Sequence, residues 1–150
     1  MTLNLATPLR ESASAFPERA ALILDDQTLS YRALHAAAQR FATALASLGI
    51  TRGQHVALLL PNVPQFCIAY YGAHYAGCPV VPLNVLLTTD EILYHLEDSD
   101  AVALVAWEGL LPQAQAAVAR AAACKALIVA QANPAATAIP ANTLSFAALL

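Results

Sequence analysis

Short apolar runs alternate along this chain with segments of helical periodicity, and this alternation limits the possible folds more than any other feature. Four runs, at residues 55–60, 79–83, 101–106 and 125–130, are nearly continuously apolar and bounded by turn signals. Such runs are typical of strands buried on both faces of a parallel sheet. We therefore predict an α/β fold with one mostly parallel sheet and flanking helices in the connections.

Four helices are predicted between and before these strands. The longest spans residues 31–48, where apolar residues recur at helical spacing between Ser30, a good N-cap, and Gly49, a good C′ residue. Thr88 and Glu91 match a capping box, Thr at the N-cap and Glu three residues later. The predicted helices cover residues 31–48, 64–76, a short segment after Thr88, and an alanine-rich segment at 110–123.

Both ends of this α/β series carry further elements. Residues 20–31 form two short apolar runs around Asp25-Asp26-Gln27, which predicts an N-terminal β-hairpin. Residues 131–143 are mostly Ala, Pro, Asn and Thr and predict a linker or surface loop. Residues 144–150 turn apolar again, which indicates either the start of a further element, cut short, or a small closing helix.

Composition excludes several classes of protein. The chain is 59% hydrophobic and 11% charged, so disorder is excluded as its main state. Seven basic residues against ten acidic ones offer no electrostatic footprint for nucleic acid or for an anionic membrane. Residues 53–89 contain no Asp, Glu, Lys or Arg, but Pro61, Asn62, Pro64, Pro79 and Pro82 interrupt the stretch, so no membrane span is predicted.

The cysteines and the N-terminus predict a cytoplasmic location. Cys67, Cys78 and Cys124 are odd in number and form no C-x-x-C pair, which is typical of free thiols in a reducing compartment. Residues 1–10 show no basic region followed by an apolar stretch, as a secretory signal would.

Residues that could carry chemistry are scattered. The five glycines are never closer than four positions apart, and Lys125 is the chain's single lysine. No serine lies in a Gly-x-Ser-x-Gly motif, and a metal site at any histidine would need ligands from elsewhere. Asn62 and Asn84 each follow a predicted strand, either at a ligand-binding sheet edge or simply as turn residues. We predict no catalytic, cofactor-binding or metal-ligating residue in this chain.

A fixed order of short motifs resembles the opening region of acyl-CoA synthetases, members of the adenylate-forming (AMP-binding) superfamily. The resemblance covers about residues 8–130 and departs from the family at Gln54-His55, a turn position. Pro82 to Leu87 is more similar to fatty-acid ligases than to amino-acid adenylation domains. The motifs, in order, are Ser30-Tyr31, Gly49 with Gly53, Pro61-Asn62, Ala76-Gly77, Pro82-Leu83-Asn84, Glu91, and Asp98-Ser99.

The resemblance implies a reaction for the full-length enzyme. A carboxylic acid of the fatty-acid type is joined to ATP with Mg²⁺ to give an acyl-adenylate, and the acyl group is then transferred to coenzyme A. The family's Gly/Ser/Thr-rich phosphate loop and its catalytic-lysine motif are not present in these 150 residues. We therefore expect an incomplete N-terminal subdomain that binds no cofactor and is inactive alone.

The same resemblance implies a domain division and partners. Residues 1–130 are expected to form the N-terminal ligase subdomain, and residues 131–150 a linker and the start of a further apolar element. The expected partner is the remainder of the ligase, or a second copy through an exposed apolar face. Two alternatives remain open: a non-catalytic interaction module, and an unrelated flavodoxin-like binding domain.

Overall fold

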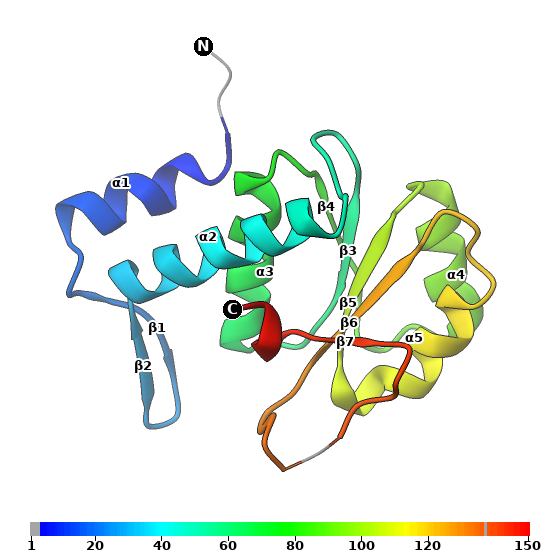
Figure 1. The fold of residues 1–150 in the computed structure, drawn as a ribbon. Coiled ribbons are helices and arrows are strands. Elements are labelled where there is room, and N and C mark those ends of the chain that lie inside the picture. Colours follow the sequence, from blue (N-terminus) through cyan, green and yellow to red (C-terminus); the bar gives the residue numbers. More distant parts are fainter. Residues whose placement is uncertain (1–3, 137) are drawn as a thin grey trace.

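A computed structural model describes residues 4–136 and 138–150 (Figure 1). The helices are α1 (Thr7–Ala15), α2 (Tyr31–Ser47), α3 (Pro64–Tyr75), α4 (Thr89–Asp98) and α5 (Leu111–Val118), with 3-10 turns at Glu108–Leu110 and Ala147–Leu149. The strands are β1 (Ala20–Leu24), β2 (Gln27–Ser30), β3 (Val56–Leu59), β4 (Val80–Pro82), β5 (Ala103–Trp107), β6 (Ala126–Ala130) and β7 (Leu144–Ser145).

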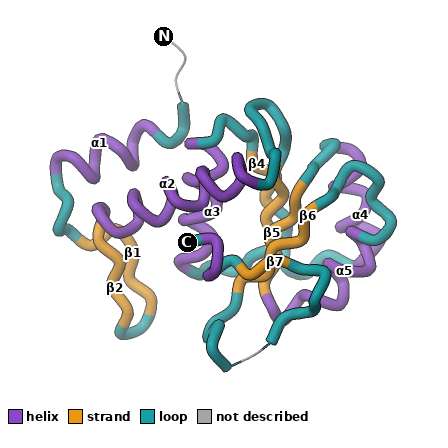
Figure 2. The backbone as a smooth tube through the Cα atoms, viewed as in Figure 1, coloured by secondary structure: helices purple, strands orange, loops and turns teal. Residues whose placement is uncertain are grey.

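Five strands form one parallel sheet in the order β4-β3-β5-β6-β7. β1 and β2 form a separate antiparallel hairpin beside the start of α2 (Figure 2). The predicted α/β class, the parallel sheet with flanking helices and the N-terminal hairpin are all confirmed.

The three central strands of the sheet, β3, β5 and β6, bury both of their faces, which explains their continuous apolar runs. In β3, Val56 and Leu58 join the core beneath α2 and α3, whereas Ala57 and Leu59 join the core beneath α4 and α5. All four residues are essentially inaccessible to solvent. We call these two layers the α2/α3 face and the α4/α5 face.

The helix boundaries follow the predicted caps. The Ser30 hydroxyl accepts a hydrogen bond from the Ala33 N–H at 3.2 Å, and Gly49 ends α2 with a φ of +75°. A φ in this region is accessible to glycine at little cost. Thr88 and Glu91 form the expected capping box at the start of α4.

Two helices differ from the predictions. Helix α1 was not predicted, because it is mostly polar and buries only Leu9, so it offers few apolar residues from which to recognise a helix. The alanine-rich helix α5 ends at Val118 instead of 123, and turns follow it. Alanine offers no stop signal, so tertiary packing decides where such a helix ends.

Residues 144–150 fold back onto the sheet. Leu144 pairs with Ile128 in the ladder between β6 and β7. Phe146 is only 2% exposed, and its ring lies 5.0 Å from that of Phe41 in α2. A short 3-10 turn then closes the chain beside α2 (Figure 1). The loop between β6 and β7 includes residue 137, which lies outside the described residues, and the domain boundary at residue 130 stays a prediction.

Candidate functional site

Ligands of open α/β sheets bind at the carboxyl ends of the parallel strands, so this edge is the expected position of a site. Asn62 follows β3 and is exposed, and Asn84 follows β4. The Asn84 Oδ1 accepts a hydrogen bond from the Leu86 N–H at 2.9 Å. This geometry is an Asx turn, so the turn interpretation holds for Asn84.

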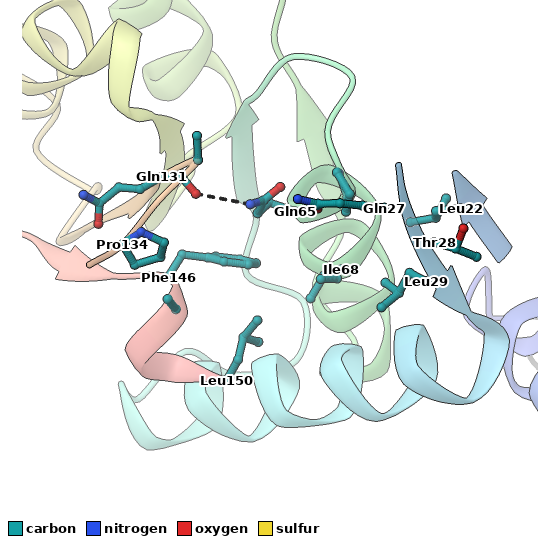
Figure 3. A pocket seen from close by; sticks show the side chains of 13 residues that line it. Leu22, Gln27, Thr28, Leu29, Gln65, Ile68, Gln131, Pro134, Phe146 and Leu150 are labelled. Atoms are coloured by element: carbon teal, nitrogen blue, oxygen red, sulfur yellow. Dashed lines mark hydrogen bonds between the residues drawn. The ribbon is translucent and has the colours of Figure 1, made fainter. Parts of the chain in front are cut away.

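A cavity of about 230 Å³ lies near the same edge, between the hairpin, the start of α3 and the segment after β6. The Gln65 Nε2 donates a hydrogen bond to the Gln131 carbonyl oxygen at 3.3 Å across its wall (Figure 3). The other lining residues are mostly apolar: Leu22, Gln27, Thr28, Leu29, Pro64, Ile68, Ala132, Pro134, Phe146, Ala147 and Leu150. None of these side chains titrates, so they offer no general acid or base.

The sequence did not indicate this cavity. Gln65 and Gln131 are 66 positions apart and belong to no recognised motif. Only the pairing of β6 with the other strands brings them together. Glutamine residues after a strand and in the first turn of a helix are too common to serve as a signal.

Lys125 lies away from this edge. It precedes β6, so it stands at the amino-terminal edge of the parallel sheet, where its side chain is exposed. Its backbone N–H donates a hydrogen bond to the Val102 carbonyl at 2.9 Å. A lysine at this position is a solvated charge at the start of a strand, and it cannot reach a ligand at the opposite edge.

The glycines also serve the fold. Gly49 and Gly77, each with a φ of +75°, end α2 and α3, and Gly53 forms the turn before β3. The Gln54 Oε1 accepts a hydrogen bond from the Thr51 N–H at 2.7 Å in that turn, so the departure from the family pattern is accommodated locally. These three glycines thus lie at helix ends and in a turn.

The thiols are poor nucleophiles. Burial raises the pKa of Cys124 to about 11 and also raises the pKa of Cys67 and of Cys78. A nucleophilic cysteine needs the opposite shift, because the thiolate is the reactive form. Burial likewise lowers the pKa of His74, which therefore stays neutral at pH 7.

The part of the chain that the structure describes offers neither a metal centre nor a membrane-spanning helix. Among residues 4–136 and 138–150, no three His, Cys, Asp or Glu side chains gather as metal ligands. In the same residues, every helix is too short or too polar to cross a bilayer.

The comparison with known proteins gives the class of this chain. Residues 9–147 match the family model of the AMP-binding enzymes. The chain therefore belongs to the AMP-binding enzyme family.

Relatives in this family are acyl-CoA ligases. The chain is 34% identical over 111 residues to the long-chain-fatty-acid–CoA ligase of Bacillus subtilis. The alignment covers 74% of this chain and 20% of that protein. It is 40% identical over 91 residues to the 2-succinylbenzoate–CoA ligase of the same organism. This second alignment covers 61% of this chain and 19% of that protein. The chain thus spans about a fifth of the length of these relatives.

Solved structures agree with the sequence relatives. A benzoate CoA ligase from Burkholderia xenovorans LB400 matches with a TM-score of 0.85 and 30% identity, over 99% of this chain and 28% of that one. The N-terminal domain of FACL13 from Mycobacterium tuberculosis matches with a TM-score of 0.80 and 30% identity, over 86% of this chain and 34% of that one. The fold is that of the N-terminal region of a CoA ligase.

Proposed function

We propose that these residues are the opening structural segment of an AMP-forming acyl-CoA ligase. The observation that carries the proposal is the match to the benzoate CoA ligase, with 30% identity and a TM-score of 0.85 over 99% of this chain. The family match over residues 9–147 supports the same assignment.

In the whole ligase, ATP, Mg²⁺ and coenzyme A are the expected cofactors. The carboxylate oxygen of the substrate attacks the α-phosphorus of ATP, pyrophosphate leaves, and the coenzyme A thiol then displaces AMP from the acyl carbon. None of these steps is assigned to a residue of this chain, because its single lysine precedes β6 at the amino-terminal edge of the sheet and its positive-φ glycines lie at helix ends and in a turn. Its role is to build the sheet on which the rest of the domain packs.

A fatty acid is the proposed substrate class. The motif from Pro82 to Leu87 supports it, as does the 34% identity to a long-chain-fatty-acid–CoA ligase. An aromatic carboxylate is the competing class, since a 2-succinylbenzoate ligase is 40% identical over a shorter stretch. The ratio of kcat/KM for dodecanoate and benzoate, measured on the whole ligase, decides between them.

The proposed partner of this segment is the remainder of the ligase, and the segment alone is proposed to self-associate. Large apolar side chains that meet water support this, among them Ile23 at 72% and Leu86 at 85% exposure. Burying apolar surface stabilises by roughly 25 cal/mol per Å², so a partner that covers such residues is favoured.

A chimera tests the structural assignment. We replace the matched segment of the Bacillus subtilis long-chain-fatty-acid–CoA ligase with this chain and measure fatty-acid-dependent pyrophosphate release. A working segment keeps activity within about tenfold of the parent, which corresponds to about 1.4 kcal/mol. A matched chimera with Phe41→Asp, a charge placed in the core, should be inactive. A chimera that is folded and soluble yet inactive contradicts the proposal.

A further inference from the structure

A hollow of about 390 Å³ lies between α1 and the first turns of α2, and we call it the α1/α2 hollow. The two helices pack side by side and run in opposite directions, so the end of α1 lies beside the start of α2 (Figure 1). The described residues that line the hollow are Arg10, Ala13, Ser14, Pro17, Arg32 and His35. Three of these six side chains are basic, one carries a hydroxyl, and none carries a carboxylate. The hollow thus offers hydrogen-bond donors, unlike the mostly apolar cavity near the carboxyl edge of the sheet.

His35 is held in position by the last residue of α3. Its Nδ1 lies 2.8 Å from the Tyr75 hydroxyl oxygen in a hydrogen bond, and the two rings meet edge to face at 5.5 Å. The other ring nitrogen, Nε2, takes part in no hydrogen bond of the described residues. The buried side-chain atoms without a partner do not include Nε2, so solvent reaches it. When the Tyr75 hydroxyl donates to Nδ1, Nε2 carries the ring proton and can donate to a ligand.

Arg10 brings a positive charge that no described carboxylate neutralises. Neither ion pair of the described residues includes it. It lies close enough to Tyr75 to affect that hydroxyl: burial raises the pKa of Tyr75, and the charge of Arg10 acts against the rise. The Ser14 hydroxyl, one turn further along α1, also forms no hydrogen bond with the described residues. The α1 wall therefore presents a guanidinium and a hydroxyl whose donors are free for an anion.

Arg32 is shared with a carboxylate that does not line the hollow. Its Nη2 lies 2.6 Å from the Glu18 Oε1, and the two side chains are 68% and 75% exposed. An ion pair this exposed is weak, and a guanidinium has five N–H donors, so Arg32 keeps donors for a second anion. The backbone N–H of Arg32 also donates to the Pro17 carbonyl oxygen at 3.0 Å, which holds the loop at the end of the hollow. Glu18 is thus a competitor for Arg32.

We propose that the α1/α2 hollow binds a phosphate group, either as free phosphate or as a phosphate monoester. The donors are Arg10 and Ser14 of α1 and Arg32 and His35 of α2. Donors from two helices suit a tetrahedral anion, whose oxygens point in several directions, better than a planar carboxylate. Guanidinium groups also bind phosphate oxygens through paired, charge-assisted hydrogen bonds. This site goes beyond the structural role proposed above and does not depend on ligase activity.

The test is a titration of the ¹⁵N-labelled 150-residue chain with inorganic phosphate, followed through the NMR shifts of the backbone amides. Sodium chloride at equal ionic strength is the blank. We expect saturable shifts confined to residues 10–17 and 31–36, with a dissociation constant of about 1 mM that rises with added salt, because both arginines are exposed. Phenyl phosphate distinguishes the two sources: tighter binding than inorganic phosphate assigns the hollow to a monoester, and equal or weaker binding assigns it to free phosphate.

Three variants separate a site from general attraction of anions, and circular dichroism checks that each one folds. Arg10→Gln should weaken phosphate binding about tenfold. Arg40→Gln is the matched control, because it removes the same charge from an exposed arginine of α2 that does not line the hollow, and it should leave binding unchanged. Glu18→Gln releases Arg32 and should tighten binding. Shifts that do not saturate, equal losses in Arg10→Gln and Arg40→Gln, or unchanged or weaker binding by Glu18→Gln overturns the proposal.

Discussion

The two faces of the sheet are covered in different ways. On the α2/α3 face, the aromatic rings of Phe41 and Phe146 are buried, and α2 and α3 approach so closely that Gly72 has no space for a side chain. On the α4/α5 face, the buried side chains of the described residues are Ala, Leu, Ile and Cys. The first layer therefore depends on the fit of buried aromatic rings, whereas the described residues of the second layer bury no aromatic ring. Single substitutions should therefore be more damaging on the α2/α3 face.

The largest effect is expected from Phe41→Ala. Phe41 is fully buried and its ring contacts that of Phe146, so truncation removes transfer energy and leaves a cavity. We expect the free energy of unfolding to fall by about 3–5 kcal/mol in urea denaturation. Phe16→Ala is the control, because Phe16 is 48% exposed and should cost less than about 1 kcal/mol. Equal losses in the two variants would show that the face is not packed as described.

A pH series compares one thiol from each face. Burial raises the pKa of Cys124 to about 11, and its ordinary value is 9.0. The folded state therefore keeps the proton longer than the unfolded state does, and this contribution to stability is complete below pH 9 and lost as pH rises toward 11. Two pKa units correspond to about 2.7 kcal/mol.

The measurement is the difference in unfolding free energy between wild type and Cys124→Ala, which should shrink as pH rises from 8 to about 11. Cys78→Ala, on the α2/α3 face, should show the same direction, because burial raises the pKa of Cys78 as well. A difference that is constant over this range would contradict the burial of these thiols.

The contact between α2 and α3 is tested by Gly72→Ala. An added Cβ would lie 2.8 Å from the Ala38 carbonyl oxygen and 2.8 Å from a carbon of the Phe41 ring. The backbone oxygen cannot move aside, so the helices must separate, and we expect a loss of about 1–3 kcal/mol in thermal or urea unfolding. Gly109→Ala is the control, because the nearest atom there lies 3.5 Å away. If the Gly72→Ala variant is as stable as the wild type, α2 and α3 do not approach each other as closely as described.

Helix caps should matter on both faces. Thr88→Ala removes the whole capping box of α4, and Ser30→Ala removes a single hydrogen bond at the start of α2. We expect losses of about 1 kcal/mol, with Thr88→Ala the larger of the two, measured by urea denaturation. If Ser30→Ala costs more, position in the fold outweighs the number of capping bonds.

The smallest effect is expected at the ion pair between α4 and α5. The Arg120 Nη1 lies 2.6 Å from the Asp90 Oδ1, but both side chains are largely exposed. Arg120→Ala should cost less than about 1 kcal/mol, and 1 M salt should remove the difference. A loss that persists in high salt would indicate a packing role for the arginine stem instead.

Most strands and helices could be predicted from the sequence, because their signals lie within short stretches of neighbouring residues. Continuous apolar runs such as 55–60 and 101–106 predicted strands buried on both faces, and the Thr88–Glu91 spacing predicted a cap that forms as expected. Strand β7 was not predicted, because two residues are too few to show a period. Helix α1 was missed for a related reason, since it is mostly polar and buries only Leu9.

The cavity near the carboxyl edge could not be predicted. It depends on contacts between the hairpin, α3 and the segment after β6, which are distant in sequence. Periodicity describes how one element is buried, but it carries no information about the space left where three elements meet. The motif order predicted the family, and the family match confirmed it.

This chain has the fold of an AMP-binding enzyme's N-terminal region, and our central proposal is that it is inactive by itself. The most direct measurement is carboxylate-dependent pyrophosphate release by the purified 150-residue chain, with ATP, Mg²⁺, coenzyme A and fatty acids of several lengths. The account predicts a rate equal to the background without protein. Turnover that co-purifies with the chain through successive columns, and is lost in Phe41→Asp, would contradict it.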